Sequence, residues 1–254
     1  MILTHEHGAV RELQLNHPPA NALSPAVIDA LIQEVERAPA QGVRALVLSG
    51  APGMFSAGLD VPHLLTLDPP TMARVWRNFY ALLRSLATST LPIAVAITGH
   101  APAGGAVLSI FCDWRIATQG EWKIGLNEVQ VGLILPPVIL SALQRVVGLR
   151  QAERLSVAGL LISPAEAQRI GLVDEVVPAG DTVQRAVIWC QNILALPAEA
   201  MLNTRKQARA DLAAIFERDL ESELEIITGY WWSEETQSVL RKLVERLASK
   251  KAKV

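Results

Sequence analysis

The sequence predicts an α/β fold in which largely parallel strands alternate with helices, followed by a helical C-terminal part. Two apolar runs, at 43–50 and 91–98, are nearly uninterrupted, which is typical of strands buried on both faces. Between and after these runs, apolar residues recur at helical spacing, and beyond about residue 197 no strand pattern is visible. Strands joined by helices imply a parallel sheet with right-handed crossovers.

The first part of the chain is predicted to form a strand, a helix and a second strand. Residues 9–16 alternate apolar and polar side chains, as in a strand with one covered face. Ser24 followed by Pro25 indicates a helix start, because serine caps free N–H groups and proline suits the first helical position. The apolar stripe of this helix comprises Val27, Ile28, Leu31, Ile32 and Val35. The buried strand at 43–50 follows.

Two glycine-rich segments interrupt the middle of the chain. The segment at 50–60 precedes a long amphipathic helix, and the segment at 99–113 leads from the strand at 91–98 directly into an apolar helix. The stripe of the long helix comprises Met72, Val75, Trp76, Phe79, Tyr80, Leu83 and Leu86. A short strand is expected at 113–118.

The C-terminal part is predicted to be helical apart from a short extended segment at 171–177. The predicted helices lie at about 136–170, 181–195, 197–211, 213–228 and 233–250. Near the end, Leu220, Leu224, Ile227, Trp231 and Trp232 provide more apolar surface than one helix needs. This surface is expected either to pack within the chain or to form a subunit interface.

Composition excludes several classes of function. With 25 acidic and 23 basic side chains the net charge is −2, which gives no long-range attraction for nucleic acid. No window reaches the ~18 apolar residues of a membrane span, and the first ten residues show no targeting pattern, so we expect a cytoplasmic protein without a membrane partner. Cys112 and Cys190 lie in apolar surroundings and are expected to be buried thiols.

Several common functional motifs are missing from the sequence. It contains no GxGxxG after a strand, no GxxxxGK[ST], no GxSxG, no CxxC pair and no HExxH. These absences remove the usual support for dinucleotide, nucleoside triphosphate, serine-hydrolase and metallopeptidase sites. The residues His5, Glu6 and His7 are of types that can bind a metal ion. We expect this run to lie in a mobile N-terminus, however, and predict no metal site.

Two small-residue segments, FSAGLD at 55–60 and HAPAGGAV at 100–107, follow apolar strands, where open α/β sheets bind ligands. In the first, small residues leave the N–H of Leu59 free to point outward, with Asp60 beginning a helix. In the second, Gly104 opens a helix whose unpaired N–H groups suit a developing negative oxygen. Together the two N–H groups would form an oxyanion hole, the alternative being two plain tight turns.

A third segment, IGLNEVQVGL at 124–133, carries Glu128 among apolar residues. A carboxylate in such a setting is paired, caps a helix, or is held partly desolvated with a raised pKa so that it can accept and return protons. Asp60 and Asp113 lie at element ends and are interpreted as caps. His100 is a rival base, or else a polar residue at the end of a strand.

The segments FSAGLD, GHAPAGGAVLSIFCDWRIA and IGLNEVQVGLILP together resemble the crotonase (enoyl-CoA hydratase/isomerase) superfamily, and NHPPANALS resembles its N-terminal substrate loop. The resemblance covers about residues 8–195. The segments APAGG, GLNEVQ and SEETQSVLRKLVERL are most similar to the mitochondrial-type Δ3,Δ2-enoyl-CoA isomerases. The resemblance implies a crotonase-like core of repeated ββα units arranged as a spiral at 1–196, a C-terminal helical trimerisation region at 197–254, and a homotrimer or hexamer.

The resemblance also implies a site for an acyl-CoA, with coenzyme A as part of the substrate and no separate cofactor. The thioester oxygen would lie between the N–H groups of Leu59 and Gly104, and Glu128 would be the base. The expected substrate contacts are Ala57, Gly58, Asp60 and Val61 along the CoA and thioester path, and Asn127 beside the acyl chain. We also expect Lys250, Lys251 and Lys253 to help hold the CoA phosphates, unless this basic run is only a solvated helix end.

One departure from the family pattern helps to choose the reaction. Hydratases of the superfamily use a second glutamate in the helix after the glycine turn, and this chain has Val107 there. The expected reaction is therefore the conversion of 3-enoyl-CoA to trans-2-enoyl-CoA through an enolate, in fatty acid β-oxidation. The alternatives are another acyl-CoA reaction, such as hydration, hydrolysis, decarboxylation or dehalogenation, and a non-catalytic binding protein.

Overall fold

The structure, a computed structural model, describes residues 1–251 and the side chains up to residue 249. Its main sheet has six strands in the order β1-β2-β3-β5-β7-β9. All neighbouring strands are parallel except the N-terminal hairpin of β1 and β2. The strands are β1 (Ile2–His7), β2 (Val10–Leu15), β3 (Ala45–Ser49), β5 (Ile93–Ile97), β7 (Trp114–Thr118) and β9 (Glu175–Val177). The predicted α/β class with a largely parallel core is confirmed.

A second, smaller sheet joins the strands β4 (Gly53–Met54), β6 (Gly99–Pro102) and β8 (Ile124–Gly125). Each short strand follows one long strand of the main sheet: β3 leads to β4, β5 to β6, and β7 to β8. A helix or helical turn comes after each pair. The repeated ββα arrangement is thereby confirmed. The strands β4 and β6 lie in the two glycine-rich segments, and β8 begins the segment that carries Glu128.

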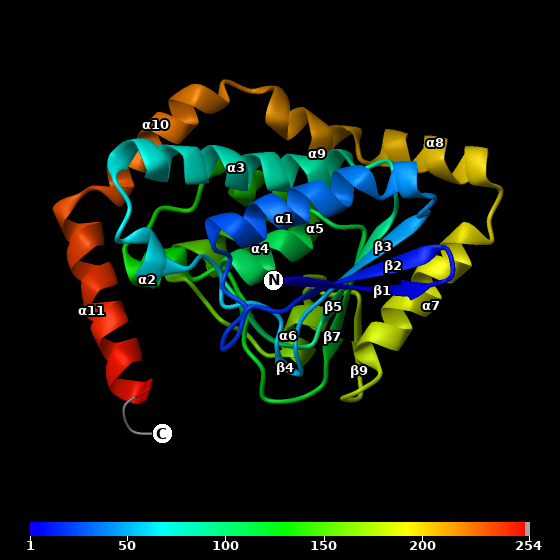
Figure 1. Ribbon diagram of the computed structural model, residues 1–254, viewed down its shortest axis with the longest axis horizontal. Coiled ribbons are helices and arrows are strands. Elements are labelled where there is room, and N and C mark those ends of the chain that lie inside the picture. Colours follow the sequence, from blue (N-terminus) through cyan, green and yellow to red (C-terminus); the bar gives the residue numbers. More distant parts are fainter. Residues whose placement is uncertain (252–254) are drawn as a thin grey trace.

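Helices cover both faces of the main sheet (Figure 1). On one face lie α1 (Pro25–Arg37) and α3 (Pro69–Thr88), and on the other α7 (Thr182–Leu194) packs against β3, β5 and β7. All five residues of both β3 and β5 are buried, because each strand has helices on both sides. The remaining helices of the core are α2 (Val61–Leu64), α4 (Gly104–Ile110), α5 (Pro137–Ala158) and α6 (Pro164–Arg169).

The predicted helix starts at Ser24 and Asp60 are confirmed. The Ser24 hydroxyl accepts the Val27 N–H at 3.4 Å, and the Asp60 carboxylate accepts the His63 N–H at 3.3 Å. Asp113 is not a helix cap. Its carboxylate accepts the Ile93 N–H at 2.8 Å and receives two hydrogen bonds from Arg205, so it ties the start of β5 to the C-terminal helices.

The N-terminus differs from the expectation of a mobile segment. Residues 2–7 form β1, which pairs along its whole length with β2. The side chain of His5 hydrogen-bonds to Gln14 and that of His7 to Glu12, both at 3.2 Å, so the two histidines link the strands of the hairpin. Within the described part of the chain, no cluster of three His, Cys, Asp or Glu side chains could hold a metal ion. Cys112 and Cys190 are buried free thiols, as predicted.

The C-terminal region consists of α8 (Ala198–Ala208), α9 (Ala210–Ala214), α10 (Leu220–Trp231) and α11 (Glu234–Lys251). The predicted helix at 213–228 is wrong, because the chain turns at 215–217 and is extended at Arg218 before Asp219 caps α10. Leu224, Ile227 and Trp231 are buried within the chain, and α10 contacts α3 (Figure 1). None of the described helices is long and apolar enough to cross a membrane.

Candidate active site

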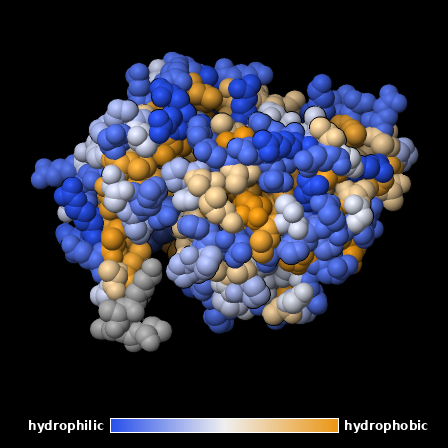
Figure 2. All heavy atoms as spheres, viewed as in Figure 1, coloured by the Kyte–Doolittle hydropathy of each residue, from blue (hydrophilic) through white to orange (hydrophobic). Residues whose placement is uncertain are grey.

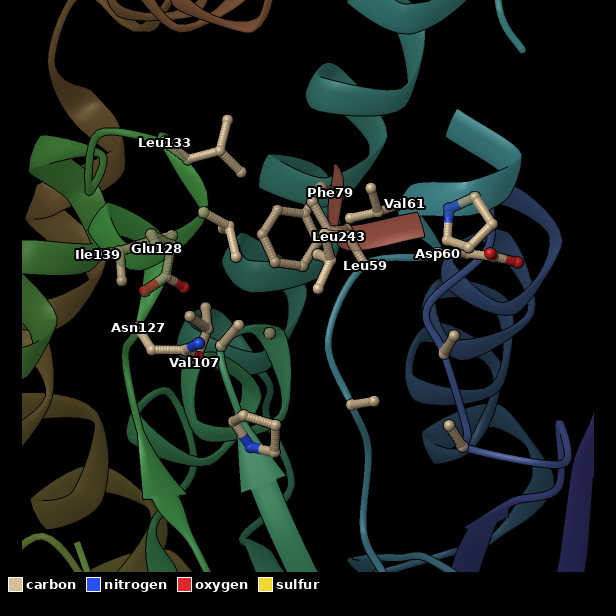
Figure 3. A pocket seen from close by; sticks show the side chains of 18 of the residues that line it. Leu59, Asp60, Val61, Phe79, Val107, Asn127, Glu128, Leu133, Ile139 and Leu243 are labelled. Atoms are coloured by element: carbon tan, nitrogen blue, oxygen red, sulfur yellow. The ribbon is translucent and has the colours of Figure 1, made fainter. Parts of the chain in front are cut away.

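A cavity of about 990 Å³ lies where the two glycine-rich turns meet the segment after β8. Its wall also includes the loop after β2, helix α2, and the sides of α3, α10 and α11. Most of its side chains are apolar, and the polar ones stand at separate places, as Figure 3 shows for Glu128, Asn127 and Asp60. Such an apolar cavity with a few polar groups is typical of a small-molecule site.

The two glycine-rich turns lie in direct contact. A methyl group added at Gly104 would lie 3.0 Å from the Gly58 Cα, and one added at Gly58 would lie 2.9 Å from the Gly104 nitrogen. Gly58 also has a φ of +88°, which side chains rarely adopt. The turns therefore require glycine at both positions, because any larger residue would push them apart.

Each turn contributes one free backbone donor to the cavity wall. The N–H of Leu59 and the N–H of Gly104 donate to no acceptor among the described residues. The Gly104 N–H is free because this residue begins α4, and the preceding Ala103 has no side chain that could cap it. Two unpaired N–H groups from touching turns are suited to binding a negatively charged oxygen.

Glu128 is the first residue of a short 3-10 turn, η2 (Glu128–Val131), directly after β8. Its Oε2 is buried and has no hydrogen-bond partner among the described residues. Burial raises the pKa of this carboxyl group to about 7. A carboxyl group that titrates near neutral pH can both accept and return a proton.

Val107 lies one turn beyond Gly104 on α4 and is also on the cavity wall. It is 1% exposed, and Figure 3 shows it on the same side of the cavity as Glu128 and Asn127. The Asn127 Oδ1 is buried without a partner, like the Glu128 Oε2. The side chain of Val107 cannot hold a water molecule by hydrogen bonding. Among the residues that the structure describes, this end of the cavity has one carboxyl group and no second acid.

The structure brings the predicted site residues together. The cavity wall includes every one of them except Gly58, namely Ala57, Leu59, Asp60, Val61, Gly104, Asn127 and Glu128. Gly58 lies behind the wall, where its carbonyl accepts the Leu23 N–H and its Cα meets Gly104. His100 lies outside the cavity, with its Nδ1 accepting the Lys123 N–H at 3.1 Å, which removes the rival base.

The sequence interpretation missed the contribution of the last two helices. Ile227 and Tyr230 of α10 and Leu243 and Leu247 of α11 line the cavity. Figure 2 shows hydrophobic side chains along α11 and a hollow between this helix and the body of the molecule. The helical spacing of the leucines on α11 indicates that this helix packs against another surface, but it does not identify that surface as the cavity wall. The side chains of Lys250, Lys251 and Lys253 lie outside the described residues.

Comparison with known proteins shows similarity along the whole chain. A family described as enoyl-CoA hydratase/isomerase matches residues 5–251. The mouse protein named "Enoyl-CoA delta isomerase 1, mitochondrial" is 32% identical over 254 residues, covering 99% of this chain and 88% of that protein. The crystal structure of human mitochondrial delta3-delta2-enoyl-CoA isomerase has a TM-score of 0.93 at 31% identity, covering 98% of this chain and 99% of that chain.

Relatives with another name are comparably similar over a shorter stretch. A Mycobacterium avium protein named as a probable enoyl-CoA hydratase is 34% identical over 209 residues, covering 81% of this chain and 78% of that protein. Overall identity therefore does not by itself choose between the two reactions, and the residues on the cavity wall have to decide.

Proposed function

This chain belongs to the enoyl-CoA hydratase/isomerase family, and we propose that it is a Δ3,Δ2-enoyl-CoA isomerase, which moves the double bond of a 3-enoyl-CoA to give the trans-2-enoyl-CoA. The observation that carries this proposal is the buried carboxyl group of Glu128, whose Oε2 has no hydrogen-bond partner among the described residues, in an apolar cavity that also holds two free N–H groups. Val107, where a hydratase of the family would have a second glutamate, supports isomerisation over hydration.

In the proposed mechanism, Glu128 removes a proton from the α-carbon of the thioester. The electron pair of the broken C–H bond moves into the carbonyl group, and the resulting enolate oxygen is held by the N–H groups of Leu59 and Gly104. The negative charge is shared with the γ-carbon through the double bond. Glu128 then returns the same proton to the γ-carbon, and the double bond becomes conjugated with the carbonyl. No atom is gained or lost.

The contributions of the oxyanion donors and of the general base to the rate can be compared from their typical sizes. Removal of one oxyanion donor typically costs ~3 kcal/mol of transition-state stabilisation. A positioned general base contributes about 10²–10⁴-fold to the rate. The two backbone donors together therefore carry a large share of the catalysis, and Glu128 supplies the transfer path for the proton.

An assay on purified protein tests the proposal directly. Incubation with 3-hexenoyl-CoA should raise the absorbance of the conjugated enoyl thioester, without formation of a hydroxyacyl product. Incubation with trans-2-hexenoyl-CoA should give little hydration, and a malonyl-type thioester should release no carbon dioxide. Rapid hydration of the 2-enoyl substrate, or free CoA as the main product, would instead identify one of the other acyl-CoA reactions. Loss of activity towards every thioester, with salt-sensitive RNA binding, would favour the non-catalytic reading.

The isomerisation rate should depend on pH through the carboxyl group of Glu128. Because burial raises its pKa to about 7, the carboxylate that accepts the proton is lost as the pH falls below that value. We expect kcat/KM to fall about tenfold per pH unit well below pH 7 and to level off above it, since this parameter reports the free enzyme. Rates measured between about pH 5 and 9, with circular dichroism to verify folding, check this. A flat profile down to pH 5 would contradict the assignment.

We further propose that the protein acts in fatty acid β-oxidation and assembles as a homotrimer, with a hexamer as a further step. The conjugated 2-enoyl-CoA product is a thioester ready for hydration, as β-oxidation requires. Leu149 and Val157 of α5 are 72% and 74% exposed in the single chain, and an interface between copies at α5 would cover them. Light scattering of the purified protein tests the assembly, and a monomeric mass would refute it.

A further inference from the structure

We propose that Thr236, on the C-terminal helix α11, is a positioning residue that fixes the turn carrying Glu128. Through this contact α11 positions the turn that carries Glu128, and the same helix also closes the cavity. The inference rests on the proposed function, since it concerns the placement of the proposed base.

No other side chain among the described residues orients the Glu128 carboxyl group. Its Oε2 is buried without a hydrogen bond, and no side-chain bond to its carboxyl group is found among the described residues. The position of the carboxyl group therefore depends on the backbone of η2. A base displaced by about 1 Å from its working position can lose up to 10²-fold in rate, so whatever fixes this turn matters for catalysis.

The turn ends at Gly132, which has a φ of +75°. The N–H of Gly132 bonds to the Val129 carbonyl at 3.3 Å, and the N–H of Leu133 bonds to the Glu128 carbonyl at 3.0 Å. The carbonyl of Gly132 points out of the turn and accepts a hydrogen bond at 2.5 Å from the Thr236 hydroxyl. This bond connects the far end of the catalytic turn to α11.

Thr236 is held in place for this role. It is 1% exposed, its N–H donates to the Ser233 hydroxyl at 3.3 Å, and its own oxygen accepts from that hydroxyl at 3.0 Å. A methyl group added at Gly132 would lie 3.3 Å from the Thr236 Cα and 3.5 Å from the Val239 Cβ. Helix α11 therefore lies directly on the turn, and the hydroxyl bond of Thr236 joins the two.

The same face of α11 continues from the turn to the cavity. Leu240 follows Thr236 by one helical turn and is fully buried, and Leu243 and Leu247 lie further along this face on the cavity wall. Figure 3 shows Leu243 among the side chains that line the cavity, which also include Leu59 and Phe79. A displacement of α11 would thus open the cavity and release the anchor of Glu128 together.

The test compares Thr236→Val, which removes the hydroxyl at nearly constant volume, with Thr236→Ser, which retains it. Thr182→Val is the matched control, because Thr182 is 2% exposed, begins helix α7 and bonds by its hydroxyl to Thr118 at 2.6 Å, away from the cavity. We expect Thr236→Val to lower kcat about tenfold with KM changed less than about threefold. Thr236→Ser should restore kcat to within about twofold, and Thr182→Val should leave it unchanged. A Thr236→Val enzyme with wild-type kcat and only the stability loss of Thr182→Val would overturn the proposal.

A second measurement separates this inference from the proposed reaction, because it needs no turnover. Difference infrared spectroscopy against Glu128→Gln follows the titration of the Glu128 carboxyl group alone, since the other ionisable groups of the described cavity wall, His17, Asp60 and Tyr230, are common to both proteins. In Thr236→Val, water should reach the loosened turn and lower the titration midpoint, with Thr182→Val unchanged. A lowered midpoint in a protein without isomerase activity would support the positioning role and reject the reaction, and an unchanged midpoint would reject the positioning role.

Discussion

Replacement of Glu128 by glutamine is expected to reduce isomerisation of 3-hexenoyl-CoA by about 10²–10⁴-fold, while the fold and CoA binding are retained. Glutamine has nearly the same shape, so it fits the same apolar place beside Asn127 and Val107, but it cannot accept the α-proton. Steady-state kinetics with CoA binding measured by calorimetry checks both parts. Near wild-type turnover would show that a group other than Glu128 is the base. That group would not be His100, which lies outside the cavity.

The same variant should change how stability depends on pH. Burial raises the pKa of Glu128 to about 7 in the folded protein, against about 4.3 for an unperturbed glutamate. The folded state therefore binds more protons between these values, and wild-type stability falls as the pH rises from about 4.3 to 7. Glutamine does not titrate, so the stability of the variant relative to wild type should rise over this range by up to about 3 kcal/mol. Urea unfolding at several pH values measures this, and a constant difference would mean that the carboxyl group is not desolvated.

The second large effect is expected for Gly104→Ala. The added methyl group would lie 3.0 Å from both the Gly58 Cα and the Leu23 Cδ1, so the two turns must separate. Separation displaces the N–H groups of Leu59 and Gly104 from a common oxygen, and we expect kcat to fall about 10²–10³-fold, as for loss of one oxyanion donor. Steady-state kinetics on 3-hexenoyl-CoA measures this loss.

Gly229→Ala is the matched control for this substitution. Gly229 lies within α10, beside the cavity residue Tyr230, and a methyl group there would meet no atom within 4 Å. This variant should keep wild-type kcat and gain up to about 1 kcal/mol of stability, because alanine favours helix more than glycine does. If Gly104→Ala retained full activity, or if both variants lost it equally, the backbone donors would not be the oxyanion site.

The parts of the fold with a strong apolar pattern could be predicted from sequence. The helices α1 and α3 were predicted because apolar residues recur along them at helical spacing, and the strands β3 and β5 because each is a nearly uninterrupted apolar run, all of it buried. The strands β4, β6 and β8 span only two to four residues, too few for any period, and their pairing depends on partners far along the chain. Strand β1 was missed because it is an edge strand with four exposed residues, so its composition resembles that of a loop.

Part of the candidate site could likewise be predicted from sequence, and part could not. The free N–H groups of Leu59 and Gly104 follow from local turn chemistry, and the isolated acid Glu128 stands out in an apolar segment, so sequence could predict that these three residues line one site. The contribution of α11 could not be predicted. A helical stripe of leucines shows that a helix has a partner but not which surface the partner is, and the Thr236 bond to Gly132 joins residues about a hundred positions apart.

The repeated ββα units also distribute the chemical groups in a regular way. The turn after β4 supplies the Leu59 N–H, the turn after β6 supplies the Gly104 N–H, and the turn after β8 supplies Glu128. A side chain in one unit can therefore be exchanged without displacing the groups that the other two units supply. Val107, in the second unit, occupies such an exchangeable position. The scaffold is in this sense modular, because two units supply backbone donors and the third supplies the acid, each from its own turn.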